Sequence, residues 1–364
     1  MKFLKIADPK FDREELKNVT DCINTGWISS TGKYVKIFES KFSNFCDAKY
    51  GVATCNGTTA LHLALKALNI GPGDEVIVPT LTFIATANVV TYTGAKAVFV
   101  DSEPATWNID ADKIEAAITK KTKAIIPVHL YGHPAEMDKI LKIAKKYKLH
   151  IIEDAAEAHG AELNGKKVGS IGDIGCFSFF GNKIITTGEG GMIVTNNKNV
   201  SDKSYVLRDH GMLPSRKYWH PYIGFNYRIT NLQAAVGVAQ LGKIHKLIQI
   251  KRKIAGFYDK HLKGIEGIKL PVELPGYKHV YWMYTILVEK SYNLPRNGLG
   301  KLLKKNSIDS RPMFYPIHIM PPYKTKNKYP VSEELSKKGL SLPSNVNLTE
   351  KDIIRIANCI RYKK

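Results

Sequence analysis

"KAIIPVHLYGHPAEMDKILKIAKKYKLHIIEDA" (residues 123–155) combines two short apolar runs with an intervening segment of helical periodicity. The runs at 123–129 and 149–155 have the length and composition of buried strands. The segment at 136–148 repeats apolar residues at the spacing of an amphipathic helix. A strand, a helix and a second strand in this order are typical of an α/β fold with a mostly parallel sheet.

The same alternation extends over most of the first 250 residues, which favours α/β over α+β. A long amphipathic helix at 231–262 then leads into a region that mixes strand-like, helical and proline-rich segments. We therefore expect a large domain over residues 1–245 and a smaller α+β domain over residues 246–364. Further strands are expected at 73–79, 95–101, 176–180, 191–196 and 281–289, and further helices at 56–70, 84–94, 298–306 and 349–361.

Composition excludes several classes of protein. The chain has 364 residues, of which 44% are hydrophobic, so it can bury a large core. No run approaches the roughly 20 apolar residues of a membrane-spanning helix, and the first residues are too polar for a signal peptide. The five cysteines are scattered and form no C-x-x-C pair, which argues against a disulfide framework and a metal site. We expect a cytoplasmic protein with no membrane partner.

The net charge of +21 raises the question of a nucleic-acid partner. Most of the 54 basic residues are lysines, and they are spread along the chain. A nucleic-acid binder more often clusters its charge and uses arginine for bidentate contacts. The charge therefore indicates a solvated, lysine-rich surface without a nucleic-acid partner, and it would also attract an anionic substrate.

Three motifs suggest one ligand. "NGTT" (56–59) opens a predicted helix, where backbone N–H groups and the helix dipole favour a phosphate, although an ordinary helix cap is the alternative. Asp154 ends a predicted strand, where it could pair with a protonated ring nitrogen or merely cap the next turn. Lys183, in "GNKIITTGEGG" (181–191), has apolar and small neighbours. Unless it is an ordinary surface charge, its lowered pKa would make it a nucleophile toward an aldehyde. Together these groups suit pyridoxal 5'-phosphate.

The sequence resembles the DegT/DnrJ/EryC1/StrS aminotransferases, which act on nucleotide-linked keto-sugars and have the type I pyridoxal-phosphate aminotransferase fold. The resemblance covers nearly the whole chain. It rests on "TGWISSTGKYVKIFESKF" (25–42), "NGTTALHLAL" (56–65), "GDIGCFSFFGNKIITTGEGGM" (172–192), "FNYRITNLQAAVGVAQL" (225–241) and "SRPMFYPIH" (310–318).

The resemblance implies roles for individual residues. Lys183 would carry the cofactor and then move a proton, and Asp154 would keep the ring nitrogen protonated. Asn226, supported by Arg228, would reach the cofactor of a neighbouring subunit, so a homodimer with shared active sites is implied. Other cofactor contacts would come from Gly57, Thr58, Phe83, Glu157 and Ser178.

The resemblance also implies the substrates. Lys183 stands where some relatives have the histidine of a dehydratase, so transamination from L-glutamate to C4 of a nucleotide-linked 4-keto-6-deoxy sugar is favoured. The pattern favours a GDP-linked deoxymannose derivative, with UDP- or dTDP-4-dehydro-6-deoxyglucose as alternatives. A non-catalytic binding or regulatory protein on the same scaffold is the alternative of another class. The sugar nucleotide would meet Trp27, Ser29, Ser30, His159, Tyr218, Trp219, His220, Arg311, Tyr315 and His318, of which His159 could instead be structural.

Overall fold

A seven-stranded sheet forms the centre of the computed structural model, which describes residues 2–362. Its strand order is β1-β9-β8-β5-β4-β2-β3. Strand β9 runs antiparallel to both of its neighbours, and the other adjacent pairs are parallel, which confirms the expected α/β class. The strands are β1 (Tyr50–Thr54), β2 (Glu75–Pro79), β3 (Lys96–Val100), β4 (Thr122–Ile125), β5 (His150–Asp154), β8 (Ile174–Ser178) and β9 (Gly191–Thr195).

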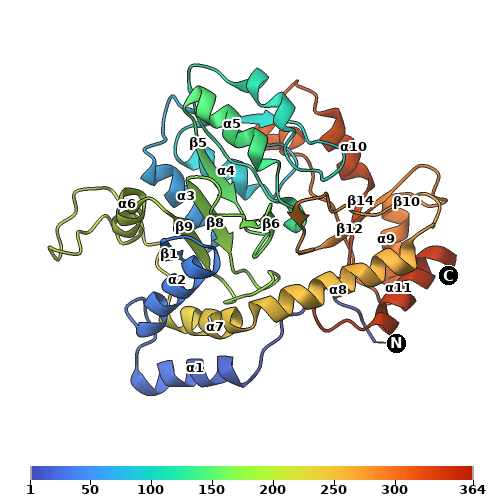
Figure 1. The fold of residues 1–364 in the computed structure, drawn as a ribbon, viewed down its shortest axis with the longest axis horizontal. Helices are drawn as coiled ribbons and strands as arrows, with labels where there is room; N and C mark the ends of the chain where they lie inside the picture. The colour runs from blue at the N-terminus through green and yellow to red at the C-terminus, as the bar shows by residue number, and fades with distance from the viewer. Residues whose placement is uncertain (1, 363–364) are drawn as a thin grey trace.

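Helices cover both faces of this sheet (Figure 1). Side chains alternate along a strand, so Val76 and Val78 of β2 pack into one core cluster and Ile77 packs into another. The first cluster contains α3 (Gly57–Ala67), α4 (Ala85–Tyr92) and α6 (Lys198–Arg208). The opposite face meets α2 (Lys33–Phe45), α5 (Met137–Tyr147), α7 (Asn231–Gly242) and α8 (Ile244–Leu262).

The helix expected at 231–262 is divided in two. Lys243 adopts φ −117° and ψ 9°, which ends α7 and lets α8 begin in a new direction. The 19 residues of α8 then carry the chain out from beneath the large sheet toward the C-terminal part (Figure 1).

A second, antiparallel sheet forms the centre of the C-terminal part, with the order β10-β12-β14-β13. Tyr258 of α8 and Tyr284 of β12 stack inside its core with ring centroids 4.6 Å apart. The strands are β10 (Ile268–Lys269), β12 (Tyr284–Val288), β13 (Arg311–Pro312) and β14 (Gly339–Leu342), and they pack with α9 (Arg296–Lys305) and α11 (Glu350–Tyr362). Strands β6 (Glu162–Leu163), β7 (Lys166–Lys167) and β11 (Tyr277–Lys278) form a small third sheet.

The N-terminal segment packs on this C-terminal part before the chain enters the large domain. The N–H of Leu4 donates to the carbonyl of Ser307 at 2.9 Å, and the N–H of Ser344 donates to the carbonyl of Ile6 at 2.9 Å. Only then does α1 (Arg13–Thr25) pack against α7. The first residues thus contact the C-terminal part, whereas the expected boundary assigns residues 1–245 to the large domain.

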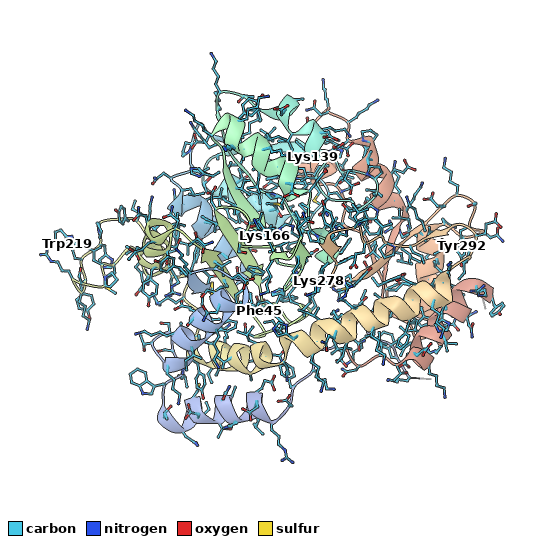
Figure 2. The ribbon with its side chains drawn as sticks, viewed as in Figure 1. Phe45, Lys139, Lys166, Trp219, Lys278 and Tyr292 are labelled. Atoms are coloured by element: carbon cyan, nitrogen blue, oxygen red, sulfur yellow. The ribbon has the colours of Figure 1, made fainter. Side chains whose placement is uncertain are left out.

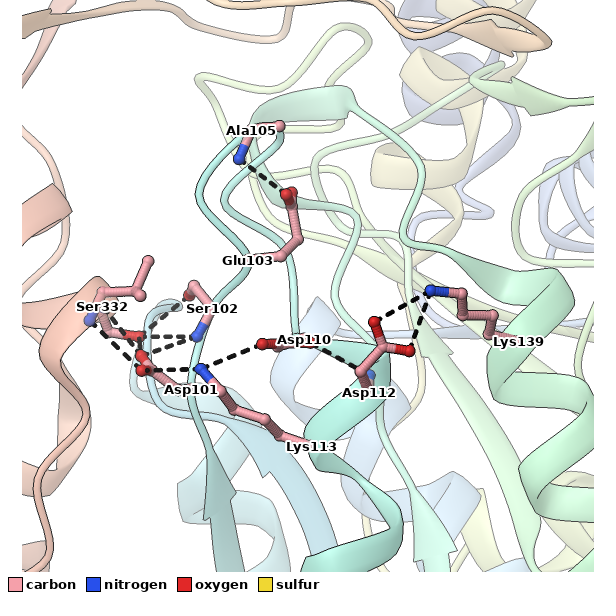
Figure 3. Close-up of polar contacts among 10 residues, drawn as sticks. Asp101, Ser102, Glu103, Ala105, Asp110, Asp112, Lys113, Lys139 and Ser332 are labelled. Carbon is pink, nitrogen blue, oxygen red and sulfur yellow. Dashed lines mark hydrogen bonds and ion pairs between the residues drawn. The ribbon is translucent and has the colours of Figure 1, made fainter.

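A polar network ties the C-terminal part to the edge of the large sheet (Figure 3). Asp101, just after β3, accepts hydrogen bonds from the N–H and the hydroxyl of Ser332 at 2.9 and 2.7 Å. Ser332 lies in α10 (Pro330–Lys338). The Lys113 ammonium lies 3.4 Å from Asp101 and 3.1 Å from Asp110. Because Asp101 and Ser332 are both buried, this network fixes α10 against the large domain.

Candidate active site

A cavity of about 500 Å³ lies between the carboxyl ends of the large sheet's parallel strands and the smaller unit. This is the edge at which α/β sheets usually bind their ligands. The large domain lines it with Asn56, Gly57, Thr58, Phe83, Asp154, Glu157, Ser178, Lys183 and Glu189, and the C-terminal part with Trp282, Met283, Arg311, Pro312, Phe314 and Ser341.

One end of the cavity is the N-terminus of α3. Asn56 caps this helix, since its side-chain oxygen accepts the N–H of Thr59 at 2.9 Å. The N–H groups of Gly57 and Thr58 precede the first N–H that donates within the helix, that of Ala60 to the carbonyl of Asn56, so they are available to a ligand. A Cβ on Gly57 would lie 2.7 Å from the Cβ of Ser178, so only glycine lets the helix approach that serine. Asn56 is thus a helix cap, and the N–H groups that follow it lie where an anion would be favoured.

Asp154 lies at the last position of β5 and lines the same cavity. One carboxylate oxygen accepts the hydroxyl of Thr86 at 2.8 Å, and the other accepts the N–H of Ala156 at 3.3 Å. Burial raises the pKa of Asp154 above its ordinary value. The carboxylate closes a turn through Ala156, as one of the two interpretations predicts. It also lines the cavity, where a cationic ring nitrogen would stabilise its buried negative charge.

Lys183 lies on the loop between β8 and β9, with its side chain 11% exposed. Its Nζ lies 3.9 Å from Oε1 of Glu157 and 4.0 Å from the ring centroid of Trp282. Burial lowers its pKa below the ordinary value of a lysine. The side chain is therefore enclosed by the cavity wall and is not a surface charge.

Glu157 is the acid next to this amine. Its second oxygen accepts the N–H of Tyr131 at 2.8 Å, and Tyr131 holds the left-handed backbone conformation at φ 54°. Burial raises the pKa of Glu157 to about 7. A carboxyl group with this pKa can hold or release a proton near neutral pH.

An aromatic wall completes the cavity. Tyr131 stacks with Trp282 at a centroid distance of 6.1 Å and with Phe314 at 5.5 Å, and Phe83 lies 5.9 Å from Phe314. Sequence reasoning identified only Phe83 of these four. The other three come from segments remote in sequence, and of these only Phe314 lies in a quoted motif, "SRPMFYPIH" (310–318), from which Arg311, Tyr315 and His318 were selected instead.

Two histidines expected at the substrate do not line the cavity. His159 is fully buried, its ring lies among those of Phe42, Phe177 and Phe179, and burial lowers its pKa to about 3. This position matches the structural alternative. His318 is 2% exposed and lies 2.7 Å from the hydroxyl of Thr80. The geometry gives neither imidazole direct access to a ligand in this cavity.

The other expected substrate residues divide into two groups. Arg311 lines the cavity, whereas Tyr315 is 57% exposed outside it. The 25–30 loop and the 209–226 loop contribute no residue to the lining of the cavity. Figure 2 shows Trp219 at the far end of the second loop, which extends from the body of the molecule. The residues on these loops are Trp27, Ser29, Ser30, Tyr218, Trp219, His220 and the exposed Asn226.

No group of three or more His, Cys, Asp or Glu side chains in residues 2–362 is arranged to hold a metal ion. No helix in the same range has the length and apolar character needed to span a membrane.

Comparisons with known proteins agree with this geometry. Residues 9–361 match the model of the DegT/DnrJ/EryC1/StrS aminotransferase family. The chain is 50% identical over 357 residues to a GDP-perosamine synthase of Caulobacter vibrioides, covering 97% of this chain and 96% of that one. It is 46% identical over 361 residues to a GDP-perosamine synthase of Escherichia coli O157:H7, covering 99% and 98%. The X-ray structure of S. venezuelae DesV superimposes with a TM-score of 0.94 at 32% identity, covering 100% and 99%.

Proposed function

The chain belongs to the DegT/DnrJ/EryC1/StrS aminotransferase family, and we propose that it transfers the amino group of L-glutamate to C4 of a GDP-linked 4-keto-6-deoxy sugar. It is a pyridoxal-phosphate-dependent aminotransferase. The observation that carries the proposal is the meeting of Lys183, Asp154 and the α3 N-terminus at one cavity.

The groups around the cavity fit the cofactor. The free N–H groups of Gly57 and Thr58, with the hydroxyl of Ser178, would hold the phosphate at a helix N-terminus. The Asp154 carboxylate would face the ring nitrogen, and Phe83 would contact the ring. When bound, pyridoxal phosphate supplies the electron sink for the transfer.

The protein's own residues would orient the groups and move the protons. Asp154 would hold the positive charge on the ring nitrogen, so its loss should lower the reaction rate more than the cofactor affinity. Lys183, as a free amine, would take a proton from the C4' carbon of the cofactor and deliver it to C4 of the sugar. Glu157 lies 3.9 Å from that amine, and its carboxylate would favour the protonated form of Lys183.

The identity of the sugar is proposed from the relatives. Two GDP-perosamine synthases are 50% and 46% identical to this chain over nearly its whole length. They favour GDP-4-dehydro-6-deoxy-D-mannose as substrate and GDP-perosamine as product, over the UDP- and dTDP-glucose derivatives. They also favour an enzyme over a non-catalytic protein on the same scaffold. Arg311, in the cavity wall, has the planar fork that contacts two oxygens of a diphosphate.

We further propose a homodimer with shared active sites. Tyr218, Trp219, Tyr222 and Ile223 lie on one loop and are between 50% and 93% exposed, which is unusual for large apolar side chains. A second copy of the chain would cover them and would receive Asn226, backed by Arg228, near its cofactor phosphate. In this arrangement the 25–30 loop, Trp219, His220 and Tyr315 would meet the sugar nucleotide across the interface. A cytoplasmic location is supported by the free thiols of Cys22, Cys46, Cys55 and Cys176.

The experiment that tests the function is a comparison of three substrates. The purified protein is incubated with L-glutamate and with each of the GDP-, UDP- and dTDP-linked 4-keto-6-deoxy sugars, and the amino sugars are measured by mass spectrometry. We expect the GDP sugar to react with the highest kcat/KM. Preferential turnover of a UDP or dTDP sugar would overturn the choice of substrate, and no amination of any of them would overturn the function.

A further inference from the structure

Trp282 is the residue of the smaller unit that contacts Lys183 at the cavity. The Lys183 Nζ lies over the indole face, 4.0 Å from the ring centroid. The indole N–H donates to the carbonyl of Asn182 at 2.8 Å, so the residue beside Lys183 fixes the rotation of the ring. The side chain of Trp282 therefore presents its electron-rich face to the amine and its polar edge to the loop that carries the amine.

Lys251 fixes the backbone of the same tryptophan. Its Nζ donates to the carbonyl of Trp282 at 2.8 Å and to the carbonyl of Ser344 at 2.6 Å. Lys251 is 7% exposed, and burial is the cause that lowers its pKa to about 7. Burying a lysine without an opposite charge costs free energy. The two hydrogen bonds of Lys251 therefore indicate that it holds the backbone of Trp282 and Ser344 in place.

We propose that the indole face of Trp282 receives the Lys183 ammonium whenever that amine is not bonded to the cofactor, and that Lys251 keeps the indole in place. The inference rests on the proposed function, in which Lys183 must leave the cofactor when the amino group of the donor takes its place. A free amine would then need a fixed position from which to move a proton. Trp282 and Lys251 are positioning residues, because they act through Lys183.

The charges around Lys183 set the direction of the expected effect. Glu157 and, farther away, Asp154 raise the pKa of the amine, whereas burial lowers it and is the largest influence. His159, a further titratable neighbour, is fully buried, and burial lowers its own pKa to about 3. An indole face stabilises the ammonium form, so its removal should lower the pKa of Lys183 further. A cation–π contact in a desolvated site corresponds to a shift of about one pH unit or more.

The test follows the amine in the cofactor-free protein. Pyridoxal phosphate is added at a series of pH values, and the rate at which visible absorbance develops is measured, since only the neutral amine reacts. We expect the midpoint of the pH profile to fall by about one unit in Trp282→Leu and by less in Trp282→Phe, which keeps a weaker π face. Phe257→Leu is the matched control, because it removes a ring beneath Lys253 at 5.6 Å, remote from the cavity. A Trp282→Leu midpoint equal to those of the control and the unsubstituted protein would overturn the inference.

Lys251→Met tests the proposal that Lys251 holds the indole in place. This substitution should also lower the midpoint of the pH profile. The midpoint of the double variant with Trp282→Leu should be no lower than that of Trp282→Leu alone, because both residues act through one contact. A Lys251→Met midpoint at the unsubstituted value contradicts the role of Lys251. If Trp282→Leu does not fold, the same pH profile is measured for Trp282→Phe. A midpoint equal to that of the unsubstituted protein would then overturn the role of the indole.

A separate readout distinguishes this inference from the proposed function. Borohydride reduction attaches the cofactor permanently to the lysine that carries it, and peptide mapping identifies that lysine. A label on another lysine would overturn the proposed function itself. A label on Lys183 together with unshifted midpoints would overturn only the positioning roles.

Discussion

The Nζ of Lys183 lies 3.9 Å from Oε1 of Glu157, and both side chains are nearly closed to solvent. Burial lowers the pKa of the amine and raises that of the acid. The two shifts bring the pKa values of the amine and the acid closer together, which allows a proton to pass between them near neutral pH.

Replacing Lys183 by alanine should abolish turnover and the visible absorbance of the bound cofactor. The loss of turnover should be about 1,000-fold or more, because the variant lacks the group that moves the proton. Absorbance spectra and a glutamate-dependent amination assay measure both effects. An unchanged visible band in this variant would show that another lysine carries the cofactor.

Asp154→Asn should lower kcat by about 100-fold or more while it changes cofactor affinity less, because the amide keeps the shape but loses the charge opposite the ring nitrogen. Thr86→Val is the graded companion, since it removes only the 2.8 Å hydrogen bond to the carboxylate. Steady-state kinetics and cofactor titration of both variants show which substitution lowers kcat more, and we expect it to be Asp154→Asn. A larger loss of activity in Thr86→Val than in Asp154→Asn would refute this role.

Gly57→Ala should weaken cofactor binding by about 10-fold or more, because its Cβ would lie 2.7 Å from the Cβ of Ser178 and would spread the anion cradle. Gly256→Ala in α8 is the control, since no atom lies within 4 Å of its Cβ. That control should bind the cofactor normally and gain about 0.5 to 1 kcal/mol of stability. Equal cofactor affinity in the two variants would argue against a phosphate at the α3 N-terminus.

The cofactor-free protein should lose stability as the pH rises from about 4.5 to about 7 through Glu157. The folded-state pKa of this group is raised, so the folded state binds the proton more tightly than the unfolded state, and the advantage disappears above the folded-state pKa. Glu157→Gln should remove this dependence and be more stable at neutral pH by roughly 3 kcal/mol. Thermal unfolding between pH 5 and pH 8 measures it, with exposed Glu266→Gln as the control. Parallel pH profiles for all three proteins would contradict the raised pKa.

Mixing two inactive variants tests the shared active site. Lys183→Ala and Asn226→Ala damage opposite halves of the proposed site, so a mixed dimer would contain one undamaged site. Refolding the two chains together should restore roughly a quarter of the activity, as random pairing gives. No recovery, with mixed dimers shown to form, would place Asn226 and Lys183 in the same site of a single chain.

The sequence predicted those parts of the site that depend on local rules. A strand end placed Asp154 at the ligand edge of the sheet, and the start of a helix placed Gly57 and Thr58 beside it. The apolar and glycine-rich neighbourhood of Lys183 anticipated its burial. These residues needed only strand, helix and loop boundaries to be approximately right.

The rest of the site depends on packing that no local pattern encodes. Trp282 reaches Asn182 across 100 residues of sequence, and the apolar run 281–289 that contains it gives no sign of which side chains meet the cavity. His159 and His318 have the chemistry of a binding site, but neighbouring aromatic rings and Thr80 enclose them. The helix break at Lys243 was also missed, because apolar periodicity continues across it.

The most direct test of the central claim is to identify the lysine that carries the cofactor. The holoprotein is reduced with borohydride and digested, and the labelled peptide is sequenced by mass spectrometry. The structure offers a clear competitor in Lys251, which is 7% exposed, has a pKa lowered to about 7 and does not line the cavity. Labelling of Lys183 alone is the predicted result, and labelling of Lys251 or of any other lysine in its place would contradict the proposed site.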